Sequence, residues 1–344
     1  MFHMKQLMTT TSIVELLNTL HKRDCEPILI VGDVMLDHYQ YGKVERISPE
    51  APVPIVNIKS EEFKLGGAAN VANNITKLKG TTYLIGVIGD DLNGDVLLKL
   101  LNKNKIPNTL LKKKDYFTTT KTRIIAKSQQ LLRIDKEQIH HDFSYHLTKI
   151  VQKFLPEFKI IIISDYGKGA IGKSLIDMLC SSSALVLIDP KERNFKNYRK
   201  PFIMTPNKKE AEDLSGIHID TKESLLKAGE IIIEKTGTTN LLITLGEQGM
   251  VLFENKGKLV LHLPALTRKV YDVTGAGDTV LSALALGLSK KMSLIESCIF
   301  ANICAGIVVG KMGTSYPEWQ EIFDNSNKWK KYLQIKPWKE DKTT

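Results

Sequence analysis

Short apolar runs recur along the chain and end in small or polar residues. Residues 28–32, 83–89 and 159–164 form three of them. Unbroken runs of this kind predict strands that are buried on both faces of a parallel sheet. After residue 140 such strands alternate with predicted helices, which places helices on both faces of the sheet. The expected fold class is a three-layer α/β/α core with a mostly parallel central sheet.

Two other regions alternate apolar and polar positions. Residues 39–58 consist of short pieces broken by prolines, and residues 118–135 are rich in β-branched side chains with a turn near residues 128–129. The alternation in residues 118–135 predicts antiparallel strands, and the pieces in residues 39–58 suggest strands that project from the main sheet. We expect a small β-sheet here that forms a lid over the site. Exposed strand edges are a liability for a monomer, so we also expect a homodimer that pairs or stacks its lid strands.

The first 25 residues differ from the core pattern. Ile13, Leu16, Leu17 and Leu20 have helical spacing, which predicts an amphipathic lead-in helix within residues 1–25. No charged start followed by an apolar run and a small-residue cleavage site is visible, so a secretory signal is not expected.

One large domain is expected over residues 26–318. Residues 319–344 are polar and rich in lysine, and we expect a tail there that is anchored by Trp319, Trp329 and Trp338. The 344 residues contain 42% hydrophobic side chains, which is ample for a sizeable core.

The net charge of +10 raises the question of nucleic-acid binding. The basic residues are scattered and form no stripe interleaved with aromatic side chains, so a nucleic-acid partner is not expected. A basic surface that attracts small anions is the better interpretation. Four cysteines without CxxC spacing indicate reduced thiols and a cytoplasmic protein. The longest apolar run, near residues 298–309, is too short to span a membrane.

The stretch from Tyr271 to Thr279 is the strongest candidate for chemistry. Gly275, Ala276 and Gly277 form a small-residue turn directly before an apolar helix, whose first N–H groups favour an anion. Asp278 either caps that helix or accepts a proton from a substrate hydroxyl while the turn holds a phosphoryl group.

Further candidates follow predicted strands. Asp33 and Asp37 come after the first strand, where ligands of open α/β sheets bind, although a turn and a cap would also explain them. A predicted helix begins with Gly66, Gly67 and Asn70. The small residues either let the backbone approach a polyol that Asn70 binds, or allow this helix to pack tightly on the sheet.

Asn207 and Glu210 have the spacing of a capping box, and the alternative role for the pair is to organise Mg²⁺ and its waters. Thr244 and Gly246 form another small-residue turn at a strand end. Four basic residues are candidate anion ligands, although surface exposure is the default explanation for the two arginines. These four are Arg123, Arg133, Lys168 and Lys191.

The order and spacing of these motifs resemble the ribokinase-like (PfkB-type) sugar kinase family over residues 28–316. The resemblance implies a ribokinase-like fold, Asp278 as catalytic base and residues 275–277 as the anion hole. It also implies roles for two further groups of residues. Asn207, Glu210, Thr244 and Gly246 would bind ATP and Mg²⁺, and Asp33, Asp37, Gly66, Gly67 and Asn70 would bind the sugar.

Five segments are also similar to the subgroup of this family that phosphorylates D-glycero-β-D-manno-heptose 7-phosphate. The segments are Gly32–Gly42, Arg46–Pro54, Gln129–Asp135, Ser164–Gly169 and Val309–Ser315. The subgroup transfers the ATP γ-phosphoryl group to the anomeric hydroxyl, on the route to ADP-heptose and the lipopolysaccharide core. In many bacteria this kinase is fused to a nucleotidyltransferase with a His-x-Gly-His motif. That motif is absent here, so we expect a separate nucleotidyltransferase.

The resemblance further implies a monovalent cation such as K⁺ beside the anion hole, near Asp272, Thr274 and Gly313. The sugar 7-phosphate would need a subset of the four basic candidates named above. Three alternatives remain open at this point. They are another sugar or nucleoside kinase, a non-catalytic sensor on the same fold, and a nucleic-acid-binding role motivated only by charge.

Overall fold

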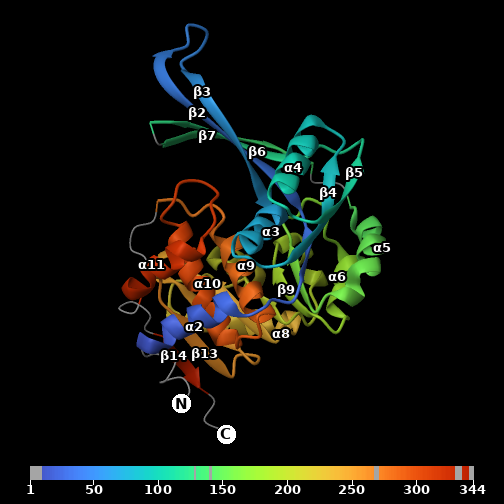
Figure 1. The fold of residues 1–344 in the computed structure, drawn as a ribbon, viewed down its shortest axis with the longest axis vertical. Coiled ribbons are helices and arrows are strands. Elements are labelled where there is room, and N and C mark those ends of the chain that lie inside the picture. The colour runs from blue at the N-terminus through green and yellow to red at the C-terminus, as the bar shows by residue number, and fades with distance from the viewer. Residues whose placement is uncertain (1–9, 128, 139–141, 267–270, 330–334, 341–344) are drawn as a thin grey trace.

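The fold was analysed in a computed structural model that describes residues 10–127, 129–138, 142–266, 271–329 and 335–340. These residues form a large sheet, helices that cover both of its faces, and a small sheet that projects from the body (Figure 1).

The large sheet has ten strands. Seven neighbouring strands, from β11 (Asn240–Thr244) to the edge strand β5 (Asn108–Lys113), are all parallel. Its other three strands, β12, β13 and β14, continue the sheet in antiparallel pairing. In spatial order the strands are β14 (Lys336–Glu340), β13 (Leu259–Leu263), β12 (Met250–Glu254), β11 (Asn240–Thr244), β10 (Ile203–Met204), β9 (Leu185–Asp189), β8 (Ile160–Ser164), β1 (Ile28–Gly32), β4 (Thr82–Gly89) and β5 (Asn108–Lys113).

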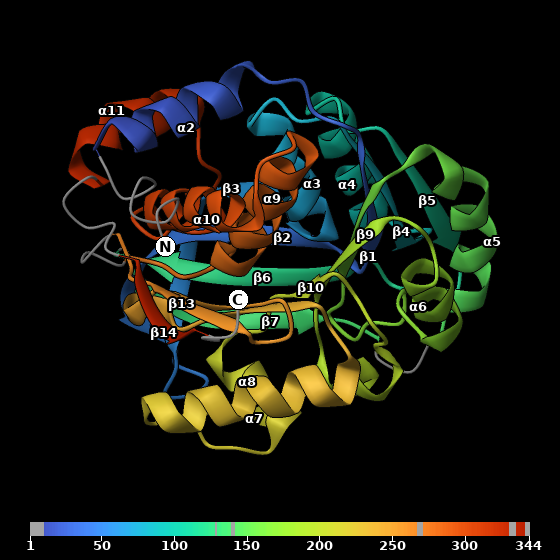
Figure 2. The same ribbon diagram turned by 90° about the horizontal axis from the view of Figure 1, so that it is seen from below.

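Two apolar clusters cover the two faces of this sheet. Alternate residues of β1 point to opposite sides, so Ile28 and Ile30 join one cluster while Leu29 and Val31 join the other. This explains why the strand is apolar at every position. The resulting three layers, visible in Figure 2, confirm the predicted fold class.

The helices divide between the two faces. One face carries α2 (Thr10–Lys22), α3 (Ala68–Lys77), α4 (Leu92–Lys103), α9 (Ala276–Ser289), α10 (Leu294–Val308) and α11 (Trp319–Trp329). The other carries α5 (Ser144–Phe154), α6 (Lys173–Cys180), α7 (Lys208–Ser215) and α8 (Lys222–Thr236). Short 3₁₀ turns are η1 (Leu155–Glu157), η2 (Glu192–Asn197) and η3 (Gly246–Gln248).

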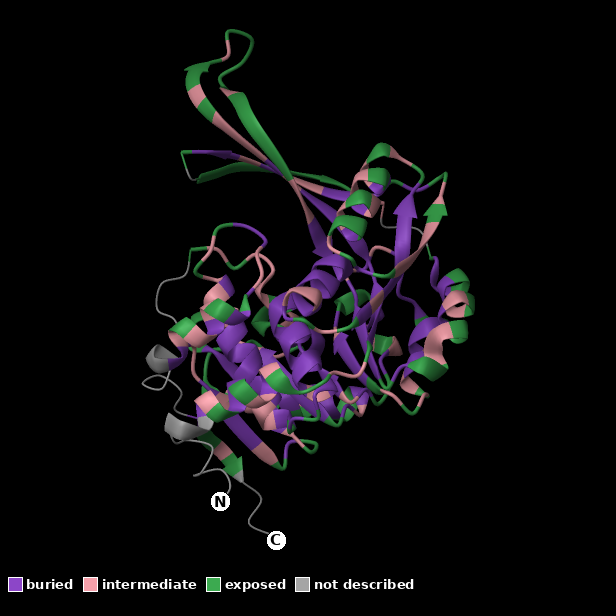
Figure 3. Cartoon of the chain, viewed as in Figure 1, coloured by how far each residue is buried: buried purple, intermediate pink, exposed green. Residues whose placement is uncertain are grey.

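The lid is a four-stranded sheet in the order β3-β2-β6-β7. Its strands are β2 (Val34–Ile47), β3 (Pro54–Gly67), β6 (Thr119–Ala126) and β7 (Gln129–Lys136). Together, β2 and β3 extend beyond the predicted segment 39–58 at both ends, because their ends near the core are buried and lack simple alternation. Strands β6 and β7 pair antiparallel, as predicted for residues 118–135. Strands β2 and β3 are also antiparallel, and the central pair β2 and β6 is parallel. The far half of the lid is largely exposed (Figure 3).

The ends of the chain belong to the folded body to a greater extent than the sequence predicts. Helix α2 covers most of the predicted lead-in, and residues 1–9 lie outside the described part. The segment predicted as a polar tail contains α11 and the edge strand β14. Trp319 is buried, stacks on Phe300 and donates from its indole N–H to the Leu78 carbonyl at 2.8 Å. Trp319 was predicted as an anchor, whereas the Lys-rich composition concealed the helix and the edge strand. The side chain of Trp329 lies outside the description.

Helix α8 provides a stability test in which local propensity and packing oppose each other. Alanine is favoured over glycine in a helix by about 1 kcal/mol. A Cβ at Gly229, however, would lie 2.3 Å from the buried Phe253 ring. We expect Gly229→Ala to destabilise the protein by about 1–3 kcal/mol in urea unfolding, because the ring must shift in a packed core. Exposed Lys227→Ala is the control, and a more stable Gly229→Ala protein would contradict the prediction.

Candidate active site

Parallel strands deliver several polar residues to one edge of the large sheet. Asp33 follows β1, Asp165 follows β8, Asp189 ends β9 and Asn207 follows β10. An isolated bridge between Asn207 and Thr244 links the ends of β10 and β11 at the same edge. The carboxyl ends of parallel strands are where open α/β sheets bind ligands.

Asp278 lies in the first turn of α9 and is only 5% exposed. Its carboxylate accepts hydrogen bonds from the Asn70 amide nitrogen at 2.7 Å and from the Tyr166 hydroxyl at 2.6 Å. Burial raises the pKa of Asp278 to about 6; these two hydrogen bonds oppose the rise, and the Asp37 charge adds to it. A buried carboxylate that still ionises near neutral pH is suited to accept a proton from a hydroxyl.

The turn before α9 presents N–H groups beside this carboxylate. Gly275 has a φ of 78°, a left-handed conformation that favours glycine. The Ala276 N–H already donates to a carbonyl three residues earlier, at 3.1 Å. The N–H groups of Gly277 and Asp278 have no hydrogen-bond acceptor among the described residues. A Cβ added at Gly277 would have no atom within 4 Å, so there is open space beside it. Helix N-termini with unpaired N–H groups are anion sites.

A cavity of about 810 Å³ opens next to the turn. Its polar lining includes three residues predicted to bind ATP, namely Asn207, Thr244 and Gly246. Its walls are mostly apolar or small and include Leu245, Met250, Ala265, Leu266, Val273, Ala276, Gly277, Val280, Ala305 and Val309. An apolar cavity that ends at free N–H groups fits a nucleotide, with its base on the walls and its phosphates at α9.

The capping-box interpretation of Asn207 and Glu210 is correct, since both reciprocal hydrogen bonds of the box are present. Glu210 also pairs with Lys191, whose Nζ lies 3.2 Å from a carboxylate oxygen. Asp189, which the sequence did not single out, interacts electrostatically with Glu210 and Lys191. Burial, followed by the charges of Glu210 and Asp278, raises the pKa of Asp189 well above its usual value.

Glu210 and Asp189 offer the hard carboxylate oxygens that Mg²⁺ prefers. Mg²⁺ usually takes one or two carboxylates and completes its shell with water and substrate phosphates, so this pair fits that ion. Within the described ranges, no cluster of three or more His, Cys, Asp or Glu residues is arranged to hold a metal ion.

Asp33 is buried and its carboxylate is directed at the loop after β8. Oδ2 accepts N–H groups from Tyr166 and Lys168 at 2.8 and 3.0 Å, and Oδ1 accepts from Ala170 at 2.9 Å. The sequence suggested a sugar contact at Asp33. In the structure its oxygens are engaged by three backbone donors.

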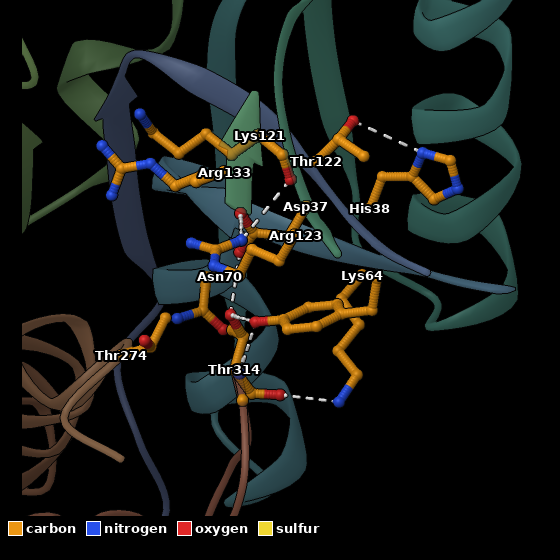
Figure 4. Close-up of polar contacts among 12 residues, drawn as sticks. Asp37, His38, Lys64, Asn70, Lys121, Thr122, Arg123, Arg133, Thr274 and Thr314 are labelled. Atoms are coloured by element: carbon orange, nitrogen blue, oxygen red, sulfur yellow. Dashed lines mark hydrogen bonds and ion pairs between the residues drawn. The ribbon is translucent and has the colours of Figure 1, made fainter. Parts of the chain in front are cut away.

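Asp37 connects the lid to the segment after α10 (Figure 4). It accepts from Arg123 at 2.7 Å and from the Thr314 hydroxyl at 2.8 Å. Thr314 also shares a 2.8 Å hydrogen bond with the Tyr39 hydroxyl. Arg123 is 7% exposed, so water has little access to its guanidinium group. Asp37, at 2.7 Å, supplies the opposite charge.

Gly66 and Gly67 end β3, next to Asp37 and Asp33. A Cβ at Gly66 would lie 3.1 Å from the Asp37 carboxylate. At Gly67 it would lie 2.5 Å from the Asp33 carbonyl, and φ there is 56°. The close approach of the two chain segments therefore requires small residues at this point.

Lid cations gather on one face of β6 and β7. Arg123 pairs in register with Arg133, and Lys121 with Asp135. Figure 4 shows the side chains of Lys121 and Arg133 projecting to the same side. Lys121 was not predicted, although it lies two residues before Arg123 on the same face.

Among the other basic candidates, Arg133 is half-exposed and pairs with Asp135 at 2.9 Å. Lys168 pairs with Glu137 at 2.8 Å, and Glu137 lies 3.8 Å from Lys121. Lys168 thus joins the lid cations, whereas Lys191 lies apart from them beside Glu210.

Asp272, Thr274 and Gly313, for which the family resemblance implied a monovalent cation, lie close together. The Asp272 carboxylate accepts N–H groups from Thr274 and Gly313, both at 2.9 Å. Burial opposes ionisation, but these hydrogen bonds together hold the pKa of Asp272 below its usual value. The charge at this position is therefore retained at neutral pH.

Tyr166, Thr314, Asp189 and Lys121 are the site residues that sequence reasoning missed. Tyr166 and Asp189 occupy strand ends, the position that drew attention to Asp33, so the same criterion could have found them. Thr314 could not be found by position, because nothing local predicts its contact with the lid.

No helix in the described part of the chain has the length and apolar character needed to cross a membrane.

Comparisons with known proteins identify the family of this chain. The family described as "pfkB family carbohydrate kinase" matches residues 26–321 of this chain. "Bifunctional protein HldE" of Helicobacter pylori (strain J99) is 42% identical over 86% of this chain and 65% of its own length. The protein of the same name from Pelobacter propionicus is 40% identical over 92% of this chain and 66% of its own length. The chain thus spans about two thirds of these relatives.

Solved structures share the fold at low sequence identity. Phosphofructokinase-2 from Escherichia coli, in complex with substrates and products, superimposes with a TM-score of 0.74 at 19% identity, covering 90% of this chain and 99% of its own. Ribokinase from Arabidopsis thaliana, complexed with ribose and ATP, gives a TM-score of 0.70 at 19% identity, covering 88% and 99%. From the family match and the 40–42% identical relatives, the chain belongs to the pfkB family of carbohydrate kinases.

Proposed function

We propose that this chain transfers the γ-phosphoryl group of ATP to the anomeric hydroxyl of D-glycero-β-D-manno-heptose 7-phosphate. Family membership supports a sugar kinase, and the five segments similar to the heptose subgroup support the acceptor. The main support for phosphoryl transfer is the position of Asp278. Its buried carboxylate has a pKa of about 6 and lies beside N–H groups that have no acceptor among the described residues. The product would be the 1,7-bisphosphate, a precursor of ADP-heptose for the lipopolysaccharide core.

In the proposed reaction the sugar lies between the lid and the start of α3, with its anomeric hydroxyl at Asp278. The oxygen attacks the γ-phosphorus, the bond to the ADP oxygen breaks, and the hydroxyl proton passes to Asp278. An anomeric hydroxyl is more acidic than an ordinary alcohol, so a carboxylate is an adequate base. The N–H groups of Gly277 and Asp278 then stabilise the charge on the transferring group.

Mg²⁺ bound with the nucleotide would neutralise charge on the phosphates. Asn207 and Glu210 would hold it, largely through water, and Asp189, whose pKa is affected by the Glu210 charge, would contribute a further carboxylate. Asp272, with Thr274 and Gly313, would hold a K⁺ ion beside the turn.

The 7-phosphate would bind at the inner face of the lid. Lys121 and Arg133 lie side by side there, and Lys168 reaches the same group through Glu137. Their partners Asp135 and Glu137 would exchange part of these contacts for the dianionic ligand. Lys191, beside Glu210, would serve the ATP phosphates instead.

A cytoplasmic homodimer that joins through the lid completes the proposal. The outer lid face supports the dimer, because Leu132 and Ile134 are 53% and 50% exposed there. Adjacent apolar side chains left open on a strand favour pairing with another copy.

The first test is ADP release with Mg-ATP and a panel of acceptors: heptose 7-phosphate, fructose 6-phosphate, ribose, fructose and adenosine. We expect selective turnover of heptose 7-phosphate, and a loss of at least about 100-fold in Asp278→Asn because the base is removed. Turnover of a different acceptor would overturn the substrate assignment but leave the base in place. Absence of turnover with every acceptor would favour a sensor.

Arg133→Ala tests the phosphate end of the sugar site. Loss of one charged, half-exposed contact is expected to raise KM for the sugar phosphate about tenfold while KM for ATP changes less than twofold. Arg46→Ala, at the exposed far end of the lid, is the matched control. Equal effects on both substrates would contradict the assignment.

Paired Leu132→Glu and Ile134→Glu substitutions test the dimer. Buried like charges at a two-fold interface are costly, so light scattering should report the monomer mass in place of the dimer mass. Leu92→Glu, on the 83% exposed residue that begins α4, should leave the dimer intact. A monomeric unsubstituted protein would refute the proposal directly.

A further inference from the structure

Asp33 holds the loop that follows β8 in place. Both of its oxygens are used, with three N–H donors from Tyr166, Lys168 and Ala170 at 2.8 to 3.0 Å. The side chain is 3% exposed, so these donors replace water. A buried carboxylate that accepts several backbone N–H groups fixes the conformation of the segment that supplies them.

The same loop carries Tyr166, whose hydroxyl donates to Asp278 Oδ1 at 2.6 Å. The other Asp278 oxygen, Oδ2, accepts from Asn70 at 2.7 Å. The carboxylate is thus held on both oxygens, from two different elements. Burial, together with the Asp278 charge, raises the pKa of Tyr166 well above its usual value, so its hydroxyl remains a donor at neutral pH.

A second buried carboxylate holds the loop from its other side. Asp165 accepts from the Gly167 N–H at 2.8 Å, and from Tyr198 and Asn194 at 2.7 Å each. Gly167 has a φ of 69°, a conformation that favours glycine. Two acidic residues that flank β1 and β8 therefore fix the backbone on either side of Tyr166.

We propose that Asp33 and Tyr166 are positioning residues for the catalytic base, with Asp33 fixing the loop and Tyr166 orienting the Asp278 carboxylate toward the acceptor hydroxyl. Neither residue forms or breaks a bond in the reaction. The inference rests on the proposed role of Asp278, and it replaces the sugar contact expected of Asp33.

Several groups around Asp278 affect its pKa, and Tyr166 acts against those that raise it. Asp37 from β2 raises the pKa of Asp278, and the charge of Asp278 raises the pKa of Asp189 on β9. Asn70 from α3 and Tyr166 are the two groups that favour its ionised form. Loss of the Tyr166 hydroxyl removes one of these two, so the pKa of Asp278 must rise.

The experiment compares pH profiles of the unsubstituted enzyme and Tyr166→Phe, with kcat measured at saturating substrates. We expect the acid limb near pH 6 to move up by about one pH unit in the variant, since one charge-assisted hydrogen bond is lost. The variant should be about tenfold slower at pH 6 and recover to within about threefold at pH 9. Ionisation of the substrates is common to both proteins and cancels in the comparison.

Tyr198→Phe is the matched control. It removes a different tyrosine–aspartate hydrogen bond, which joins Tyr198 to Asp165 of the same loop at 2.7 Å. This hydrogen bond does not involve Asp278. It should leave the acid limb in place even if it lowers the melting temperature. An equal rate loss for Tyr166→Phe at every pH, or an equal shift of the limb in Tyr198→Phe, would overturn the proposal.

Asp33→Asn tests the loop itself. The amide keeps one acceptor oxygen and turns an NH₂ group toward backbone donors, so Tyr166 loses its fixed position. We expect the acid limb to shift as in Tyr166→Phe, and the double variant to shift no further, because both changes act through one contact. Additive shifts would show that Asp33 acts by another route.

A measurement without turnover separates this inference from the proposed function. Carboxyl ¹³C NMR of aspartate-labelled protein, with Asp278 assigned from Asp278→Asn, reports the pKa of Asp278 directly. An upward shift in Tyr166→Phe supports the positioning role whichever sugar is the acceptor. An unchanged titration overturns it even if heptose 7-phosphate is the substrate.

Discussion

The burial of one ionisable carboxylate constrains much of this structure. Asp278 must remain able to ionise in an environment that favours its neutral form, and removing a charge from water is costly unless donors replace the water. Asn70 and Tyr166 supply them. Each donor is itself fixed, Asn70 through its hydrogen bonds with Asn74 on α3 and Tyr166 through the loop after β8. Elements distant in sequence are thereby tied to the first turn of α9.

A second buried charge pair connects the lid to this centre. Asp37 and Arg123 are almost fully removed from water, and such a pair is weak evidence for stability because its desolvation offsets its attraction. What it determines is geometry. Through Thr314, Asp37 fixes the base of the lid against the segment after α10, which also carries Gly313 and its contact with Asp272. The lid, the sugar side and the candidate cation site thus share one network.

Sequence reasoning recovered the parts of this arrangement that follow local rules. Unbroken runs such as Ile28–Gly32 predicted the parallel core, and the ends of predicted strands identified several candidate residues. It missed the helix and the edge strand after residue 318, although it named Trp319 as an anchor there, and it made the first lid segment too short. Contacts such as Thr314 with Asp37, or Tyr166 with Asp278, join residues more than 100 positions apart. No local pattern encodes such pairs, because tertiary packing creates them.

Asn207 and Glu210 show why a local explanation and a functional one need not compete. The capping box satisfies backbone donors at the start of α7, and it uses one Glu210 oxygen to do so. The other oxygen is left to Lys191, with Asp189 close enough for its pKa to be affected. The cap therefore holds a carboxylate rigidly at the edge of the nucleotide cavity without an additional structural element. A residue whose position is fixed by helix geometry loses little conformational entropy when a ligand binds, which is what a phosphate-binding site requires.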